Sequence, residues 1–209
     1  MDALKFKEEY EEFNNTVREK DGMTYNSMTI DEDNPVKYIT SDDALEILDS
    51  EKAIIYVGSG WCPWCRNAVP VLFDVLKDYD VQVLYYLNLD EEKSNYEIKE
   101  GELVKINDGT EGYYKLLEKL DDVLNDYVLT DENGEKYETG EKRIYMPFVI
   151  GVKDGKVVQS HVGTVTLDEN QSKYDNLTDG QYEELYDIYS NLVGSVYGKR
   201  SCSSDESCD

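Results

Sequence analysis

The segment from residue 53 to residue 87 constrains the fold more than any other part of the sequence. It begins with a continuous apolar run, Ala53 to Gly58, which is typical of a strand buried on both faces. After a turn and two cysteines, apolar side chains recur every three or four positions from Cys65 to Tyr79, and this spacing predicts an amphipathic helix. A second apolar run covers Val81 to Leu87. Strand, helix and strand at this spacing predict a right-handed βαβ crossover between parallel strands.

The residues before this unit predict an N-terminal extension followed by a strand and a helix. Apolar residues three or four positions apart predict a helix over 3–20, which the pair Asp21-Gly22 would end. Residues 23–35 are polar and rich in turn formers, so we expect residues 1–35 to form a helical extension. A short strand over 36–40 and a helix capped by Ser41 follow.

The residues after the βαβ unit predict an insertion, a hairpin and a last helix. Residues 91–143 interrupt the strand pattern with a helix whose apolar stripe runs from Tyr113 to Tyr127, and then with a tight turn at Asn133-Gly134. Two strands, 148–152 and 157–162, form an antiparallel hairpin. A capping box of Thr178 and Gln181 starts a final helix, which stops at Gly198, and residues 199–209 are expected to form a flexible tail.

Charge excludes two classes of partner. The chain of 209 residues carries 46 acidic and 21 basic residues, a net charge of −25. Such a chain is expected to repel nucleic acid and anionic lipid rather than bind them.

The 18 tyrosines argue for a folded protein, because disordered chains lack aromatic residues. No apolar run is long enough to span a membrane. The first residues resemble no secretory leader, which leaves an intracellular protein or a mature form with its leader removed.

The four cysteines form two close pairs, Cys62 with Cys65 and Cys202 with Cys208, which points to local chemistry rather than to a disulfide-stapled fold. Cys62 falls where the buried strand meets the helix. Unpaired backbone N–H groups and the helix dipole favour its thiolate there, and Pro63 suits the first helical turn. A thiolate attacks a disulfide, and a second thiol three residues later resolves the mixed disulfide. We therefore predict redox chemistry at this pair.

Two other interpretations of the cysteines stay open. In the first, the two pairs are the two halves of a zinc site. Against it, zinc-binding cysteine pairs usually lie on loops, and Cys202 and Cys208 are spaced more widely than the usual second pair. Alternatively, Cys62 and Cys65 are an inert remnant. The second pair, Cys202 and Cys208, is a candidate redox pair that shuttles electrons to the first, a local disulfide, or part of a tail without catalytic function.

Three segments of the sequence resemble the thioredoxin family. The resemblance covers residues 36–198, with 91–143 as an insertion between the two halves. It is strongest for thioredoxin-like proteins of gut Firmicutes, which are commonly exported or lipid-anchored, so it implies an extracytoplasmic location, with a cytoplasmic one as the alternative. The matching segments are Trp61-Cys62-Pro63-Trp64-Cys65 with Pro70, Leu87-Asn88-Leu89-Asp90, and Tyr145-Met146-Pro147-Phe148 continued by Lys153-Asp154-Gly155-Lys156 and Val162-Gly163.

The resemblance implies a thioredoxin-like α/β fold, with a central mixed sheet flanked by helices, an N-terminal helical extension and a helical insertion. In catalysis, Cys62 would be the attacking thiol and Cys65 the resolving thiol. Pro147 would be a cis-proline beside them, and the backbone of Met146 would hold substrate as an added strand. The partners would be protein thiols or disulfides and a redox partner protein, without cofactor or metal. The apolar rim around the cysteines would come from Trp61 and Trp64.

The sequence departs from the family at positions that govern redox direction. Reductases of the family have a buried acid six residues before the first cysteine, where this chain has Tyr56, and Tyr86 replaces the lysine commonly paired with that acid. The dipeptide between the cysteines is Pro-Trp instead of Gly-Pro. A general cytosolic reductase is therefore less expected, and the direction stays open. The predicted function is a thiol–disulfide oxidoreductase. The alternatives are a redox-inert peptide-binding module and a zinc-bound structural protein.

Overall fold

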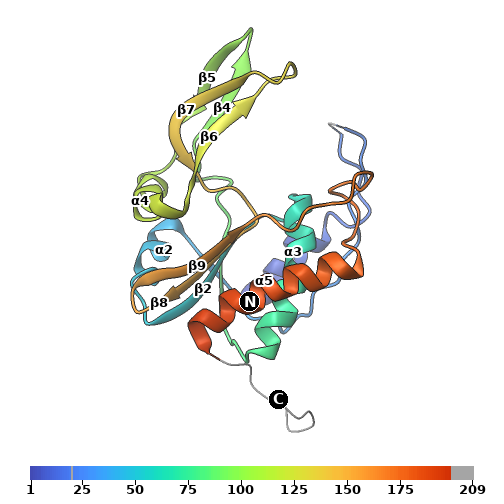
Figure 1. Cartoon of the computed structure of the whole chain (residues 1–209), viewed down its shortest axis with the longest axis vertical. Helices are drawn as coiled ribbons and strands as arrows, with labels where there is room; N and C mark the ends of the chain where they lie inside the picture. Colours follow the sequence, from blue (N-terminus) through green and yellow to red (C-terminus); the bar gives the residue numbers. More distant parts are fainter. Residues whose placement is uncertain (20, 199–209) are drawn as a thin grey trace.

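A five-stranded mixed sheet forms the centre of the computed structural model, which describes residues 1–19 and 21–198. The strand order is β1-β3-β2-β8-β9. Strands β1, β3 and β2 are parallel, β8 is antiparallel to β2, and β9 is antiparallel to β8. With helices on both faces, this topology confirms the thioredoxin-like fold (Figure 1). In chain order the elements are α1 (Asp2–Glu11), β1 (Val36–Ile39), α2 (Ser41–Ile47), β2 (Lys52–Val57), α3 (Pro63–Asp78), β3 (Leu84–Leu87), β4 (Asn95–Lys99), β5 (Glu102–Asn107), α4 (Glu111–Lys119), the 3-10 turn η1 (Asp121–Val123), β6 (Asn125–Thr130), β7 (Lys136–Arg143), β8 (Phe148–Lys153), β9 (Lys156–Val162) and α5 (Asp179–Tyr197).

The central strand β2 contributes to two separate cores, because successive side chains of a strand point to opposite faces. Ile54 and Tyr56 pack with residues of α1, α3 and α5. Ala53, Ile55 and Val57 pack with residues of α2 and α4 on the other face. All five side chains are at most 2% exposed. A strand covered on both faces explains why the sequence shows a continuous apolar run instead of an alternating one.

The N-terminal helix is shorter than the predicted helix over 3–20, because α1 ends at Glu11. The chain then turns at Asn14 and Asn15, where Asn15 has a φ of 58° and the side chain of Asn14 bonds both backbone groups of Met28. Val17, one of the apolar residues whose spacing predicted the longer helix, is 62% exposed. Asparagine side chains that bond the backbone compete with helix, and here they end it.

Four residues of the N-terminal segment belong to the main core: Phe6, Tyr10, Met28 and Ile30. Phe6 and Tyr10 of α1 are fully buried, and the Phe6 ring lies 4.8 Å from that of Tyr86 in β3. Arg66 joins this segment to α3 and to the turn before it. Its guanidinium, 1% exposed, donates to the backbone carbonyls of Tyr10, Asn26 and Gly60 and to the side chains of Asn14 and Asn26.

The insertion contains the predicted helix and, in addition, two β-hairpins. The helix α4 stops at Lys119, so the predicted helix, whose apolar stripe extended to Tyr127, was too long. Leu124 and Tyr127 follow a 3-10 turn, and Tyr127 belongs to the strand β6. The turn at Asn133-Gly134 is confirmed as the connection between β6 and β7. The hairpin β4–β5 was not predicted. We call β4, β5, β6 and β7 together the arm, which projects beyond one end of the sheet (Figure 1).

Other boundaries differ by a few residues. The N-cap of α2 is Thr40 rather than Ser41, since the Thr40 hydroxyl accepts the N–H of Asp43 at 3.2 Å. Strand β3 starts at Leu84, three residues after the predicted start at Val81. The β8–β9 hairpin, the Thr178 capping box and the stop at Gly198 are confirmed. Across the described residues, no helix combines the length and apolar character needed to cross a membrane.

Candidate functional site

The sulfurs of Cys62 and Cys65 lie together at the start of α3. Cys62 is the N-cap residue of this helix, and its Sγ accepts the backbone N–H of Cys65 at 3.3 Å. Cys62 is 4% exposed and Cys65 is fully buried, and both are free thiols. Proline in the first helical turn costs no hydrogen bond, because the missing N–H would have had no partner there. Both cysteines are therefore buried, but Cys62 borders a cavity that Cys65 does not line.

Two glycines make the turn between β2 and α3 possible by letting α1 and a tyrosine approach its backbone. A Cβ at Gly58 would overlap the hydroxyl of Tyr56 and lie 3.0 Å from that of Tyr10. A Cβ at Gly60 would overlap the backbone carbonyl of Glu9 in α1. The N–H of Gly60 donates to the Glu9 carboxylate at 3.3 Å. The turn before the cysteines is thus packed directly on the N-terminal helix.

The segment before β8 lies beside the first cysteine. The Met146–Pro147 peptide bond is cis, and the carbonyl oxygen of Met146 lies 3.9 Å from Cys62 Sγ. The Pro147 carbonyl accepts the N–H of Gly163 at 2.7 Å, which ties this segment to the end of β9. The backbone of Met146 therefore borders the Cys62 sulfur.

The two tryptophans occupy different environments beside the cysteines. Trp61 is 38% exposed, and its indole N–H donates to the Asp90 carboxylate at 2.6 Å while Lys93 lies 5.4 Å from its ring. Burial opposes ionisation of Asp90, but hydrogen bonds from Lys93 and Trp61 outweigh it and lower the pKa of that carboxyl. Trp64 is half-buried and packs against the core. Both rings border the same cavity as Cys62.

The two thiols have opposite tendencies to ionise. A hydrogen bond from the Cys65 thiol lowers the pKa of Cys62, the backbone N–H groups of Cys65 and Trp64 and the charge of Lys173 contribute, and burial opposes them. Burial raises the pKa of Cys65 well above its ordinary value, and the hydrogen bond to Cys62 and the charge there add to this. The pair therefore ionises more readily at Cys62 than at Cys65, the order that nucleophilic attack by Cys62 on a disulfide requires.

Alkylation of the reduced protein should follow this difference. We expect iodoacetamide to modify Cys62 with a half-maximal rate at a pH below about 8.5, the ordinary thiol value, because a lowered pKa leaves the thiolate present at lower pH. Cys65, fully buried and protonated, should stay unmodified. Peptide mapping by mass spectrometry after timed reaction between pH 5 and 9 measures both rates. An inflection for Cys62 at or above that of a free thiol would contradict the assignment.

Tyrosine hydroxyls lie near the Cys65 thiol. The Tyr56 hydroxyl bonds that of Tyr10 at 2.8 Å, and burial raises the pKa of both phenols well above their ordinary value. The Tyr86 hydroxyl donates to Glu9 at 2.6 Å. The buried Tyr189 hydroxyl has no hydrogen-bond partner among the described residues. The hydroxyls of Tyr10, Tyr56 and Tyr189 therefore interact with the Cys65 thiol, and the carboxylate of Glu9 in α1 accepts the hydrogen bond from Tyr86.

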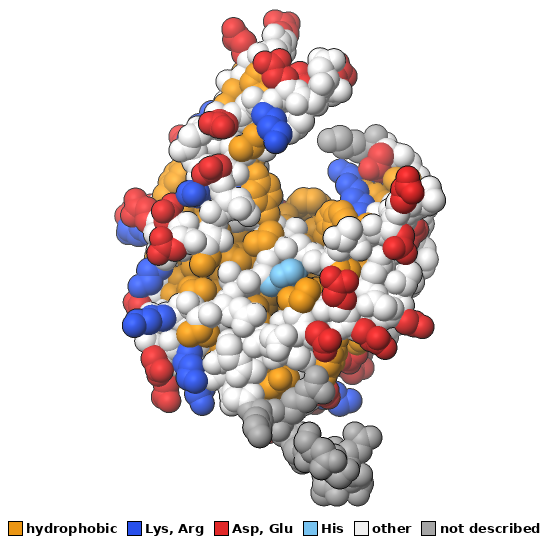
Figure 2. All heavy atoms as spheres, viewed as in Figure 1, with side chains coloured by type: hydrophobic (Ala, Val, Ile, Leu, Met, Phe, Trp, Pro, Cys, Tyr) orange, Lys and Arg blue, Asp and Glu red, His pale blue; other side chains and the backbone are white. Residues whose placement is uncertain are grey.

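A cavity of about 370 Å³, which we call the groove, opens at Cys62. It lies between the base of the arm and two loops, one after α1 and one before α5. Figure 2 shows a hollow with an apolar base and basic side chains on both walls. The predicted residues Trp61, Cys62, Trp64 and Met146 line it; Pro147 is buried behind Met146. Pro63, Leu89 and Tyr145, which also line it, belong to the three matching segments of the sequence. The sequence did not indicate the remaining lining residues, because they come from segments far apart in the chain: Arg18, Val57, Lys93, Tyr127, Arg143, Ile144 and Lys173.

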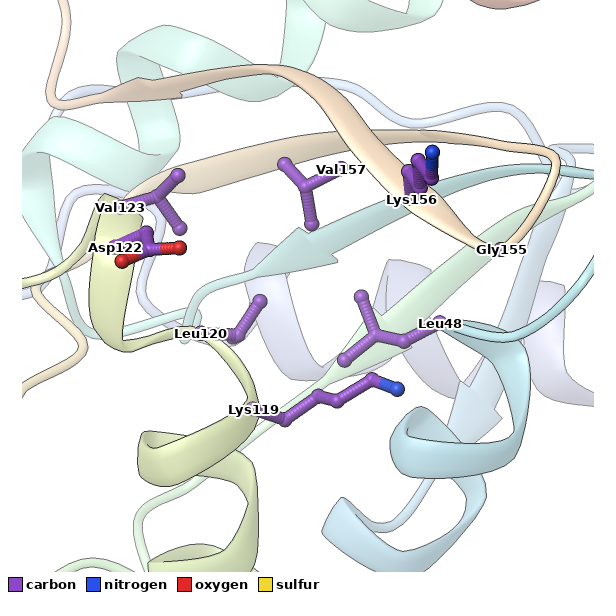
Figure 3. Close-up of a pocket in the computed structure, with 8 residues that line it drawn as sticks. All are labelled: Leu48, Lys119, Leu120, Asp122, Val123, Gly155, Lys156 and Val157. Atoms are coloured by element: carbon purple, nitrogen blue, oxygen red, sulfur yellow. The ribbon is translucent and has the colours of Figure 1, made fainter.

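A second cavity, of about 330 Å³, lies at the opposite end of β2 and β8, near the β8–β9 turn (Figure 3). Its lining contains no thiol, hydroxyl or histidine among the described residues, and the one carboxylate is that of Asp122. The chemistry of the chain therefore points to the groove. The residues that line this second cavity are Leu48, Lys119, Leu120, Asp122, Val123, Gly155, Lys156 and Val157.

The zinc interpretation needs all four cysteines, and the structure describes only two of them, Cys62 and Cys65. Within residues 1–19 and 21–198, no group of three or more His, Cys, Asp or Glu side chains is placed to hold a metal ion. Cys202 and Cys208, the predicted second pair, lie outside the described residues. Their role as a redox pair or as metal ligands therefore stays a prediction.

Comparisons with known proteins add little to this geometry. No protein-family model matches the chain, and no curated protein matches it. Similar solved structures include one titled for the thiol-resolving mechanism of a yeast mitochondrial 1-Cys peroxiredoxin, with 13% identity and a TM-score of 0.36 over 61% of this chain and 83% of that one. Another is oxidised thioredoxin from Plasmodium falciparum, with 15% identity and a TM-score of 0.37 over 74% of this chain and 98% of that one. Similarities of this size assign no activity.

Proposed function

We propose that this protein is a thiol–disulfide oxidoreductase that exchanges disulfides with protein substrates through Cys62 and Cys65. The observation that carries the proposal is the position of Cys62 Sγ, at the N-cap of α3 and 3.9 Å from the Met146 carbonyl. One sulfur is thus held at the edge of a groove, with a second thiol beneath it and a free length of backbone beside it.

The reaction proceeds in two exchanges of sulfur partners. The Cys62 thiolate attacks one sulfur of the substrate disulfide, so that a Cys62–substrate disulfide forms and the other substrate sulfur leaves as a thiolate. Cys65 then loses its proton and attacks the Cys62 sulfur, which releases the second substrate thiolate and leaves a Cys62–Cys65 disulfide. Two electrons pass from the cysteine pair to the substrate. The Cys65 proton and one proton from solvent, equal to the one that Cys62 lost on ionising, end on the substrate thiols. The reverse sequence oxidises a substrate dithiol.

The groove supplies what a protein substrate needs beside the sulfur. An extended peptide next to Met146 gains main-chain hydrogen bonds as an added strand, while the Trp61 and Trp64 rings provide apolar contact for its side chains. These contacts orient the substrate disulfide toward Cys62. An extracytoplasmic location belongs to the same proposal, and fractionation of cells that make the native protein tests it.

A redox titration tests the proposal. The variant Cys202→Ser/Cys208→Ser should form and lose one disulfide, Cys62–Cys65, in a single two-electron transition across a glutathione redox series, as measured by alkylation and mass spectrometry. A potential near about −270 mV would indicate a reductant and one near about −120 mV an oxidant. If no Cys62–Cys65 disulfide forms at any poise, or if it forms but transfers to no disulfide or dithiol peptide, the protein is a redox-inert binding module and the proposal is wrong.

A further inference from the structure

The groove has a charge opposite to that of the rest of the molecule. Acidic residues outnumber basic ones by 46 to 21 in the chain. Of the described residues that line the groove, four are basic and none is acidic. The four are Arg18, Lys93, Arg143 and Lys173, and each belongs to a segment outside the central sheet and α3.

Two of these cations are already neutralised by carboxylates. Arg18 pairs with Asp21 at 3.1 Å, and Lys93 pairs with Asp90 at 2.5 Å. These two fix local structure, because Arg18 also donates to the Tyr174 hydroxyl at 2.7 Å and Asp90 holds the indole of Trp61. They therefore contribute less net charge to a ligand in the groove.

The other two cations form no ion pair with any carboxylate of the described chain. Arg143 lies 4.4 Å from the ring of Tyr127 and donates to the carbonyl of Ser94. The ammonium of Lys173 lies 5.5 Å from the ring of Tyr174. Arg143 comes from the base of the arm and Lys173 from the loop before α5, so the two charges reach the groove from different parts of the chain. Asp21 lies close enough for its charge to interact with that of Lys173, but it forms its salt bridge with Arg18. In a protein with 25 excess negative charges, two cations of the groove without a salt bridge to the described residues are available to a ligand.

We infer that the groove selects disulfides whose cysteines are flanked by Asp or Glu, with Arg143 and Lys173 binding the carboxylates. This inference rests on the proposed exchange function and adds the class of substrate. Long-range repulsion from the acidic surface does not prevent such binding, because at about 0.15 M salt charges beyond about 8 Å are largely screened. Within the groove the two cations act at short range, where guanidinium and ammonium groups bind carboxylates through charge-assisted hydrogen bonds.

A matched pair of peptides provides the probe. The sequence of residues 203–209, Ser-Ser-Asp-Glu-Ser-Cys-Asp, contains a cysteine among three acids. The acidic probe is this peptide with its cysteine as a mixed disulfide with thionitrobenzoate. The neutral probe has Asn, Gln and Asn in place of the three acids. Attack of the Cys62 thiolate on the peptide sulfur forms the Cys62–peptide disulfide and releases coloured thionitrobenzoate, so the rate does not depend on the redox potential of the protein. Division by each probe's rate with dithiothreitol removes differences in intrinsic reactivity.

The variants separate local charge from net charge. All carry Cys202→Ser and Cys208→Ser, so that only the Cys62/Cys65 pair reacts. Lys173→Glu and Arg143→Gln change the groove, whereas Lys52→Glu and Lys77→Glu change exposed lysines at the start of β2 and the end of α3. Lys173→Glu and the two control variants alter the net charge equally. Circular dichroism and thermal unfolding confirm that each variant is folded, and Lys173→Glu tests the inference even if Arg143→Gln loosens the arm.

At about 0.15 M salt, the acidic probe should react about 5-fold faster than the neutral probe or more, a modest part of the range known for electrostatic steering. The ratio should fall to about 1 or below in Lys173→Glu and stay unchanged in Lys52→Glu and Lys77→Glu. Equal rates for the two probes in the protein with an unaltered groove would overturn the inference while the exchange function stands. An acidic-to-neutral rate ratio that Lys173→Glu and Arg143→Gln leave unchanged would do the same. If Cys62→Ser releases thionitrobenzoate as fast as the parent, the exchange function itself is wrong. Faster reaction with glutathione disulfide than with a disulfide-linked dimer of the acidic peptide would assign the charges to a small anionic thiol and overturn the choice of a protein segment.

Discussion

Cys62→Ser is expected to lower the rate of disulfide exchange by at least about a thousandfold, a loss usual for removal of a catalytic nucleophile. Serine has nearly the same size, but its hydroxyl does not ionise near neutral pH and so supplies no thiolate to attack a disulfide. Cys65→Ser should have a different effect. It leaves the attacking thiolate in place and removes the group that releases the substrate, so mixed disulfides with Cys62 should accumulate.

Both variants are tested with a disulfide-bonded peptide, in the Cys202→Ser/Cys208→Ser background so that the second pair does not contribute. The release of peptide thiols measures the exchange rates. Mass spectrometry under non-reducing conditions identifies the trapped adducts. The structure predicts adducts on residue 62 only, since Cys65 is fully buried and Cys62 borders the groove. Adducts on Cys65 in the Cys62→Ser variant, or undiminished exchange, would refute the assignment of roles.

Arg66→Met should lower the free energy of unfolding by about 3 kcal/mol or more, because breaking a buried polar network leaves several groups unpaired at about 1–3 kcal/mol each. The guanidinium of Arg66 is 1% exposed and donates to three backbone carbonyls and two asparagine side chains. Methionine fills a similar volume but donates nothing. The loss should therefore exceed the effect of removing a positive charge from the surface.

Urea unfolding followed by circular dichroism measures this loss. Lys77→Met, which removes an exposed cation from the same helix, is the matched control and should change stability by no more than about 0.5 kcal/mol. Arg66→Lys keeps the charge but loses the planar arrangement of donors, and should fall between the two. Similar stability of Arg66→Met and Lys77→Met would show that the buried network contributes nothing measurable.

The central fold was predictable because its signals are local in the sequence. The apolar run before Cys62, the stripe of α3 and the hairpin at Asp154-Gly155 each lie within one or two neighbouring elements. The arm was not predictable in the same way. Its strands are partly or fully exposed, so β4 and β5 show no apolar run. The stripe through Leu124 and Tyr127 continues a helical pattern into residues that fold as a turn and a strand.

The candidate site was predictable only in part. The cysteines, the tryptophans and Met146-Pro147 were found through their motifs. The pairing of the Tyr56 and Tyr10 hydroxyls, 46 residues apart, and the arrival of Arg143 and Lys173 at one groove depend on tertiary structure. No spacing in the sequence indicates such contacts. The chain has more than two acidic residues for every basic one, and such a total does not reveal that a few basic residues gather in one place.

The close packing of α1 on the turn before Cys62 has a consequence for anyone who redesigns this protein. The motifs suggest a self-contained unit beginning at Val36, and a shortened gene starting there would be a natural choice for expression or for grafting the cysteine motif onto another scaffold. Such a product would expose the pocket that Phe6 and Tyr10 fill, and would leave Gly60 without the Glu9 backbone it rests against. The smallest portable piece must therefore begin at or before Asp2, the first residue of α1.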